Sequence, residues 1–175
     1  ERGHEIVLCA NAAKGHTGWL KIQLSVRSVV SNRNSDIYWS PPQHLPIVRM
    51  RIPTVVTVHD MVCWKVPETM RWSRRWSDRI QLAQSVRSAN RVIAVSSSTR
   101  NDIVEHYGLD PDKATVIAEA PTIAPDGRTT KFENVRPYVL FVGTLEPRKN
   151  LTRLISSFLD CGLPNHDLII AGHQG

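Results

Sequence analysis

The chain has 175 residues, a mass of 19.7 kDa and a formal net charge of +6. Hydrophobic residues make up 41% and charged residues 22%, which excludes a disordered polymer, and 11 prolines with 9 glycines exclude a collagen-like chain. No apolar run approaches the roughly 20 residues of a membrane-spanning helix, and three scattered cysteines without a CxxC pair argue against a disulfide framework or a structural zinc site.

Short β-branched and apolar runs alternate with helical stretches along the whole chain. The expected strands are Glu5–Ala10, Asp36–Trp39, Thr54–Val58, Arg91–Val95, Thr115–Ala118, Tyr138–Gly143 and Asp167–Ala171. Two of these runs are almost continuously apolar, which is typical of parallel strands covered on both faces. No Asn-Gly or Asp-Gly turn joins two strands directly. The pattern therefore predicts a parallel, doubly wound α/β sheet.

Three helices are predicted between these strands. They span Thr69–Ala89, Ser98–Tyr107 and Asn150–Cys161. In the first, one apolar face contains Trp72, Trp76, Ile80, Ala83 and Val86. The second begins after a serine run and stops at Gly108, and the third has apolar residues at i, i+3, i+4, i+7 and i+8. The segment Trp19–Val30 fits helix and strand periods about equally, and we favour a helix.

The polar, proline-containing stretch Glu119–Pro137 interrupts the alternation and is longer than an ordinary loop. We interpret residues 121–137 as a linker between a first domain, residues 1–120, and the start of a second, residues 138–175. A single βαβ unit cannot bury its own sheet, so we expect only part of the second domain here. The start of the chain has no secretory signal pattern and no initiator Met, and we expect its true N-terminus to lie upstream.

The basic excess is concentrated between Arg49 and Arg100, where ten basic residues stand against three acidic ones. Such a region attracts phosphates of nucleic acid, anionic lipid headgroups or a phosphorylated substrate. Three of these cations, Arg71, Arg74 and Arg75, lie on the first predicted helix. They indicate either a solvated helical face or a contact with anionic membrane.

Ligands of α/β sheets bind beyond the carboxyl ends of parallel strands, and one such end carries His59 and Asp60. A histidine there can be neutral or cationic near pH 7 and can hydrogen-bond a phosphate or a sugar hydroxyl. The simpler interpretation is a loop histidine paired with a neighbouring carboxylate.

A second strand end, from Gly143 to Asn150, places Arg148 and Lys149 beside the start of a helix. Two cations there are unfavourable for the helix dipole, which suggests a bound polyanion, although a solvated pair is the alternative. A third strand end contains Gly172 and Gly175, a weak signal for a ligand-facing loop. The chain contains no GxGxxG, GxxxxGK[ST], GxSxG, HExxH or DxD motif.

Three segments resemble family 4 glycosyltransferases. They are Thr57–Met61 with Pro67-Glu68, Arg91–Ser96 with Thr99–Ile103, and Tyr138–Leu151, the most specific of the three. The resemblance covers nearly the whole chain, and within the family it is closest to bacterial mannosyltransferases of polysaccharide or O-antigen assembly.

The resemblance implies a GT-B architecture, with two Rossmann-like domains on either side of a cleft. The first would hold a glycan or lipid-linked acceptor, and the second a nucleotide sugar, with GDP-mannose favoured. A hexose would be transferred with retention of configuration and without an essential metal or other cofactor. The expected location is cytoplasmic, possibly with peripheral contact at the inner face of the membrane and no nucleic-acid partner.

The same resemblance assigns roles to single residues. Lys149 matches the family's pyrophosphate-binding lysine, with Arg148 as its neighbour and Gly143 allowing close approach. Many members carry an arginine directly after that glycine, where this chain has Thr144, and this departure bears on the role of Arg148. His59 matches the cleft histidine, the expected catalytic residue, and Gly172 and Gly175 would begin the nucleotide loop.

Two family features, an early glycine-rich loop and a paired-glutamate motif, fall outside the sequence, so we expect little transferase activity from these 175 residues alone. Two other functions stay open on the sequence. One is a non-catalytic nucleotide- or sugar-binding protein of the same twin-domain shape. The other is a phosphate-binding regulatory or nucleic-acid module that uses the basic stretch.

Overall fold

A computed structural model of the chain describes residues 5–7, 25, 26, 28–30, 32, 34–120 and 136–173. The chain divides into two compact units, Glu1–Ala120 and Pro121–Gly175, and each is described by itself. The division falls at the end of the expected first domain. Most of the expected linker, residues 121–135, lies outside the described residues.

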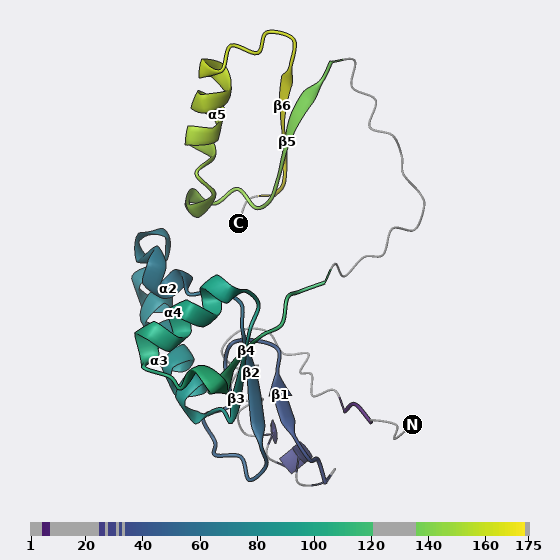
Figure 1. Cartoon of the computed structure of the whole chain (residues 1–175), viewed down its shortest axis with the longest axis vertical. Helices are drawn as coiled ribbons and strands as arrows, with labels where there is room; N and C mark the ends of the chain where they lie inside the picture. Colours follow the sequence, from purple (N-terminus) through teal and green to yellow (C-terminus); the bar gives the residue numbers. More distant parts are fainter. Residues whose placement is uncertain are drawn as a thin grey trace. The chain divides into compact units, whose positions relative to one another are not determined.

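The first unit contains a four-stranded parallel sheet (Figure 1). Its strands follow one another in the order β1 (Tyr38–Ser40), β2 (Thr54–Val58), β3 (Arg91–Ala94) and β4 (Ala114–Val116). The prediction of a parallel α/β sheet is therefore confirmed, with strand ends shifted by one or two residues, while the doubly wound arrangement, with helices on both faces, stays a prediction. The expected first strand, Glu5–Ala10, is not confirmed. Residues 5–7 have no strand conformation, and residues 8–10 lie outside the described part.

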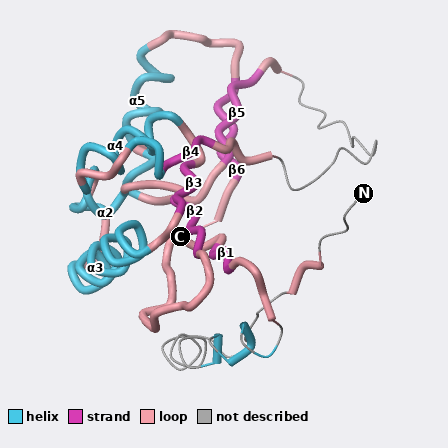
Figure 2. Tube along the Cα trace, turned by 60° about the horizontal axis from the view of Figure 1, so that its bottom comes forward, coloured by secondary structure: helices cyan, strands magenta, loops and turns pink. Residues whose placement is uncertain are grey.

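Three helices connect these strands: α2 (Val62–Lys65), α3 (Trp72–Ser88) and α4 (Ser97–Tyr107). All three lie on the same side of the sheet in both views (Figures 1 and 2). Crossovers between parallel strands share one hand, so helices between strands in consecutive order fall on one face. Short 3₁₀ turns at Pro67–Thr69 and Pro111–Lys113 complete the connections. The described residues between 25 and 32 are helical, in agreement with the favoured assignment there.

The core of the first unit lies between the sheet and these helices. It includes Val56 and Val58 of β2, Val92 and Ala94 of β3, Leu82 and Val86 of α3, and Ile103 of α4. Burying an aliphatic side chain of this size stabilises the fold by about 1.5–3 kcal/mol. This layer is the platform from which the loops after the strands project.

The inward face of α3 differs from the predicted one. Leu82, Ser85 and Val86 are buried, whereas Trp72, Trp76 and Ile80 are exposed, with 73% of Trp72 accessible to solvent. Val86 belongs to the predicted face and is buried as expected, whereas the three residues of that face nearest the start of the helix are exposed. The other buried residues, Leu82 and Ser85, lie on the neighbouring stripe of the same helix. Trp72 and Trp76 are therefore left exposed on the surface of α3.

Helix α4 begins and ends as the sequence predicts. The hydroxyl of Ser96 accepts a hydrogen bond from the amide of Thr99 at 3.1 Å, which satisfies one free N–H of the first turn. Gly108 closes the helix at a φ of +61°, a left-handed conformation that glycine adopts without a steric cost.

The second unit contains two parallel strands, β5 (Tyr138–Val142) and β6 (Asp167–Ala171), connected through α5 (Leu151–Asp160). A 3₁₀ turn, Pro147–Lys149, directly precedes α5. Of the residues described in this unit, none is buried. This βαβ unit therefore leaves both its sheet and the apolar residues of α5 partly open to solvent, as expected of an isolated βαβ unit.

Candidate functional site

The register of the first sheet brings three loops to one edge. The last residue of β1, Ser40, pairs with Val56, two residues before the end of β2. The last residues of β2, β3 and β4 lie in one row, since Val58 pairs with Ala94 and Ala94 pairs with Val116. Because all four strands are parallel, the residues that follow β1, β2 and β4 emerge at the same carboxyl edge. Loops at this edge form the binding sites of α/β sheets.

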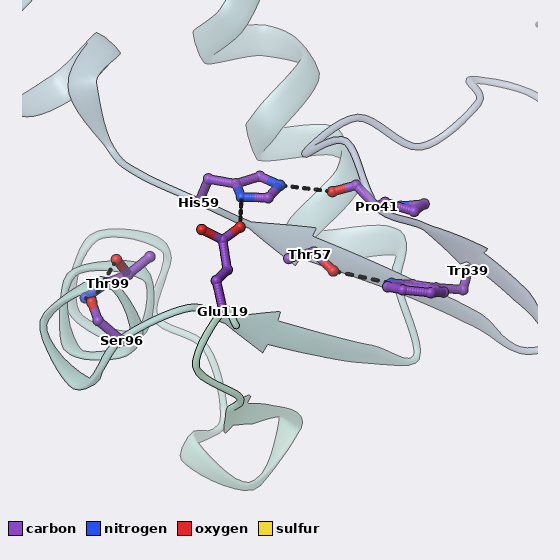
Figure 3. A network of polar contacts seen from close by, with 7 residues as sticks. All are labelled: Trp39, Pro41, Thr57, His59, Ser96, Thr99 and Glu119. Carbon is purple, nitrogen blue, oxygen red and sulfur yellow. Dashed lines mark hydrogen bonds and ion pairs between the residues drawn. The ribbon is translucent and has the colours of Figure 1, made fainter. Parts of the chain in front are cut away.

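His59 lies at this edge, directly after β2, and both of its ring nitrogens make contacts (Figure 3). Nδ1 lies 2.7 Å from Oε1 of Glu119, and Nε2 lies 2.9 Å from the carbonyl oxygen of Pro41. The ring is therefore held from two sides, by the loop after β1 and by the segment after β4. Below it, the indole N–H of Trp39 donates to Oγ1 of Thr57 at 3.0 Å and ties β1 to β2.

The carboxylate beside His59 is not the one next to it in the sequence. Oδ1 of Asp60 instead accepts from the amide of Val62 at 3.1 Å, at the start of α2. The partner is Glu119, which lies 60 residues further along the chain. The sequence predicts for Glu119 only that it begins the polar stretch Glu119–Pro137. A signal existed: Glu119 follows a predicted strand closely, and carboxyl ends of parallel strands share one edge.

In the second unit, the strand ends meet through two glycines. A Cβ placed on Gly172 would lie 1.8 Å from the carbonyl oxygen of Gly143. The amide of Gly143 donates to the carbonyl of Ala171 at 3.0 Å, and that of Leu145 donates to the carbonyl of His173 at 2.9 Å. Gly172 thus has a packing reason to be glycine besides the predicted ligand contact, and Gly175 lies outside the described residues.

Arg148 is held by a cluster of nearby side chains. Its Nε donates to Glu146 at 2.5 Å, and Oγ1 of Thr144 donates to the other carboxylate oxygen of Glu146 at 2.9 Å. The hydrogen bond from Arg148, followed by that from Thr144, lowers the pKa of the Glu146 carboxyl from its ordinary value. Thr144 therefore supports the carboxylate that orients Arg148.

Lys149 is exposed and makes no side-chain hydrogen bond or ion pair with any residue that the structure describes. It follows Arg148 on the 3₁₀ turn before α5. The two neighbouring cations therefore differ in their contacts. Arg148 already forms an ion pair with Glu146, whereas the ammonium group of Lys149 is open to an incoming anion. The unit thus groups Gly143, Arg148, Lys149 and Gly172 around the ends of β5 and β6, and His59 belongs to the other unit.

The predicted basic face on α3 is divided between exposed and engaged arginines. Arg71 and Arg74 are exposed, and Nε of Arg74 lies 3.6 Å from Oδ2 of Asp78. Arg75 is half-buried. Arg79 has a structural role, because its guanidinium lies 4.0 Å from the ring centre of Trp64. Its Nε also donates to the carbonyl of Cys63 at 2.8 Å, which fastens α2 to α3.

A cavity of about 690 Å³ lies beside the loop from Leu45 to Thr54, with Gln84 and Asn90 in its lining. Thr54 begins β2 and Asn90 precedes β3, so this cavity opens at the amino edge of the sheet. His59 is not part of it. We do not place the candidate site there, since ligands of such sheets bind at the carboxyl edge. No helix in the described part of the chain is long and apolar enough to cross a membrane.

Comparisons with known proteins agree with the sequence motifs. The profile of Glycosyltransferase Family 4 matches residues 20–119. O-antigen chain mannosyltransferase B of Escherichia coli is 27% identical over 152 residues, which cover 79% of this chain and 39% of that protein. O-antigen chain mannosyltransferase RfbU of Salmonella typhimurium is 25% identical over 134 residues, which cover 77% of this chain and 36% of that protein.

The chain thus spans between a third and two fifths of the length of these two relatives. A crystal structure of a glycosyltransferase from Rickettsia africae ESF-5 aligns with 95% of this chain and 54% of its own, at 13% identity and a TM-score of 0.47. The family profile covers more than half of the 175 residues and includes the strand end that carries His59 and its partner Glu119. The chain belongs to glycosyltransferase family 4.

Proposed function

We propose that the protein transfers a hexose, with mannose favoured, from a nucleotide sugar to a glycan or lipid-linked acceptor, with retention of configuration. GDP-mannose is the favoured donor, and no metal is required. The family match and two relatives named as O-antigen mannosyltransferases support this proposal. The observation that carries it is His59, fixed through both ring nitrogens at the carboxyl edge of the parallel sheet.

The chemistry requires stabilisation of a leaving nucleoside diphosphate while the sugar becomes oxocarbenium-like. Fixed cations stabilise such developing negative charge best in a site that excludes water. Lys149 is an exposed ammonium on the turn before α5, and we propose that it binds the donor pyrophosphate. Arg148, oriented by Glu146, would contribute a second positive charge in the same unit. In the first unit, His59 is the proposed catalytic residue.

The test uses the complete gene product with GDP-mannose, UDP-glucose and RNA as ligands in calorimetry. Binding of GDP-mannose and acceptor-dependent release of GDP are expected. A His59→Ala variant should lose about 10²-fold or more of the transfer rate, the range for a group acting directly on the reaction. Binding of GDP-mannose without any release of GDP would identify a non-catalytic binder, and binding of RNA alone would identify a nucleic-acid module.

We also propose that α3 contacts an anionic membrane, where a lipid-linked acceptor would reside. Trp72 and Trp76 are exposed one turn apart in α3, and Arg71, the residue directly before the helix, and Arg74 in its first turn are exposed as well. Aromatic side chains beside cations are typical of helices that lie at a membrane interface.

Vesicles with and without anionic lipid test this contact by co-sedimentation. A Trp72→Ala, Arg74→Glu double variant should bind anionic vesicles less well than the unmodified protein. Arg153→Glu on α5 makes the same change of charge at another exposed helix position and serves as the matched control. Binding that ignores both anionic lipid and salt would contradict the proposal.

A further inference from the structure

The two contacts of His59 restrict where its protons are. The carbonyl oxygen of Pro41 can only accept a hydrogen bond, so Nε2, at 2.9 Å, must carry a proton and donate it. An ionised carboxylate also only accepts, and Oε1 of Glu119 lies 2.7 Å from Nδ1. When Glu119 is charged, both contacts are hydrogen bonds only if both ring nitrogens are protonated.

The described residues around the ring offer it no second charged partner. Asp60, the nearest carboxylate in sequence, is directed to the amide of Val62. Among the charged side chains that the structure describes, Glu119 alone contacts the ring. Within the described residues, Glu119 is therefore the charged side chain placed to hold the His59 ring.

The fold explains why Glu119 reaches this place. The amide of Ile117 donates to the carbonyl of Ala94 at 2.9 Å, so the segment after β4 continues alongside β3. Two residues later, Glu119 lies at the carboxyl edge of the sheet, where Figure 3 shows its carboxylate turned toward the imidazole. The contact is produced by the strand order and not by a local turn.

We propose that Glu119 is a positioning residue that keeps a proton on Nδ1 of His59 and so presents the ring as a cation at the carboxyl edge of the sheet. Carboxylates that hold the second nitrogen of a functional histidine orient the ring and select its protonated form. The catalytic consequence rests on the proposed function: a cationic ring stabilises the negative charge that develops as the diphosphate leaves.

The first test reads the ring directly, by ¹⁵N NMR of the labelled chain at neutral pH, with the His59 signals assigned by their absence in His59→Gln. Both nitrogens should show protonated shifts in the unmodified chain. In Glu119→Gln, the side-chain amide can donate to Nδ1, so Nδ1 should become unprotonated while Nε2 keeps its proton. An unprotonated Nδ1 in the unmodified chain, or no change in the variant, would overturn the proposal.

Two further variants separate charge from structure. Glu119→Asp keeps the carboxylate and should keep a larger protonated fraction on Nδ1 than Glu119→Gln. Asp60→Asn removes the adjacent carboxylate and should leave both His59 signals unchanged. His59 and Glu119 side chains are 43% and 62% exposed, so the thermal midpoint is expected to stay the same in Glu119→Gln.

The second test measures transfer by the complete gene product. Glu119→Gln should lower kcat by about 10-fold with an unchanged acceptor KM, and Glu119→Asp should recover part of the rate. An unchanged kcat alongside the NMR change would overturn the catalytic part, leaving a purely structural contact. If the unmodified protein binds the donor but transfers nothing, the proposed function fails, while the NMR result still decides the role of Glu119 on the ring.

Discussion

The two strand-end sites of this chain are assembled from contacts of different range. After β2, His59 is held by Pro41 and Glu119, which lie 18 and 60 residues away in the sequence. After β5, Arg148 is held by Glu146, two residues away, and Glu146 by Thr144, again two residues away. The first arrangement exists only when the sheet has formed, whereas the side-chain contacts of the second arise within one short loop.

This difference shows where each site is vulnerable. The charges of the second site need no distant partner, but the loop that carries them is anchored by the close approach of Gly143 and Gly172 across β5 and β6. The first site rests on a buried layer, and its polar contacts add orientation to a platform that is already stable. Changes that displace the backbone at Gly143 or Gly172 should therefore disturb the second site most. Changes of side chains that are distant in the sequence, such as Glu119, should disturb the first site most.

The largest expected effect comes from Gly172→Ala. Its Cβ would lie 1.8 Å from the carbonyl oxygen of Gly143, so the ends of β5 and β6 must separate, at a cost of about 3 kcal/mol. Hydrogen exchange of the β5 and β6 amides measures the loss. Gly162→Ala is the control, because at a φ of +58° and with no atom within 4 Å it should cost only about 1 kcal/mol. Equal effects of the two variants would contradict the close-packing argument.

A smaller effect is expected from the two cations of the second site, measured by calorimetry of GDP-mannose with the complete gene product. Lys149→Ala should weaken donor binding by about tenfold, since it removes a charged group free to contact phosphate. Arg148→Ala should weaken it less, because Arg148 is already paired with Glu146. A larger loss in Arg148→Ala would show that the pair with Glu146 opens when the donor binds.

Ser96→Ala tests a local contact in the first unit. Loss of the hydroxyl that accepts from the Thr99 amide should lower the free energy of unfolding by about 1 kcal/mol, as measured by thermal denaturation. The ¹⁵N signals of His59 should not change, since its partners come from other loops. Ser98→Ala, at an exposed helical position of the same segment, is the matched control and should not destabilise the chain. A shift of the His59 signals in Ser96→Ala would break the distinction between local and distant contacts.

The smallest expected effect is the pH dependence of the Arg148–Glu146 pair. Its hydrogen bonds lower the pKa of Glu146, so the contact is complete above the ordinary pKa range of a glutamate. It is lost only as the pH falls through the lowered value. A ¹³C NMR titration of the Glu146 carboxyl should show its pKa rising in Arg148→Ala and staying the same in Arg153→Ala. An unchanged pKa in Arg148→Ala would mean that Arg148 does not hold this carboxylate.

Much of the fold was predictable because its signals are local. Continuous apolar runs such as Thr54–Val58 coincide with a strand from end to end, and the serine and glycine at the ends of α4 cap it as expected. The position of His59 after a strand, and of Arg148 and Lys149 before a helix, also follows from residues within one segment. Periodicity and capping depend on neighbours a few residues apart, so they are visible without any tertiary structure.

Three features required the packed chain. The stripe of α3 that faces the sheet contains Leu82 and Val86, and the larger apolar residues Trp72 and Trp76 stay outside, because the direction of packing and not hydrophobicity alone selects the buried face. Gly172 is confined by a backbone 29 residues earlier in the chain. Glu119 meets His59 because four parallel strands in consecutive order end at one edge, which juxtaposes side chains that no spacing along the chain relates.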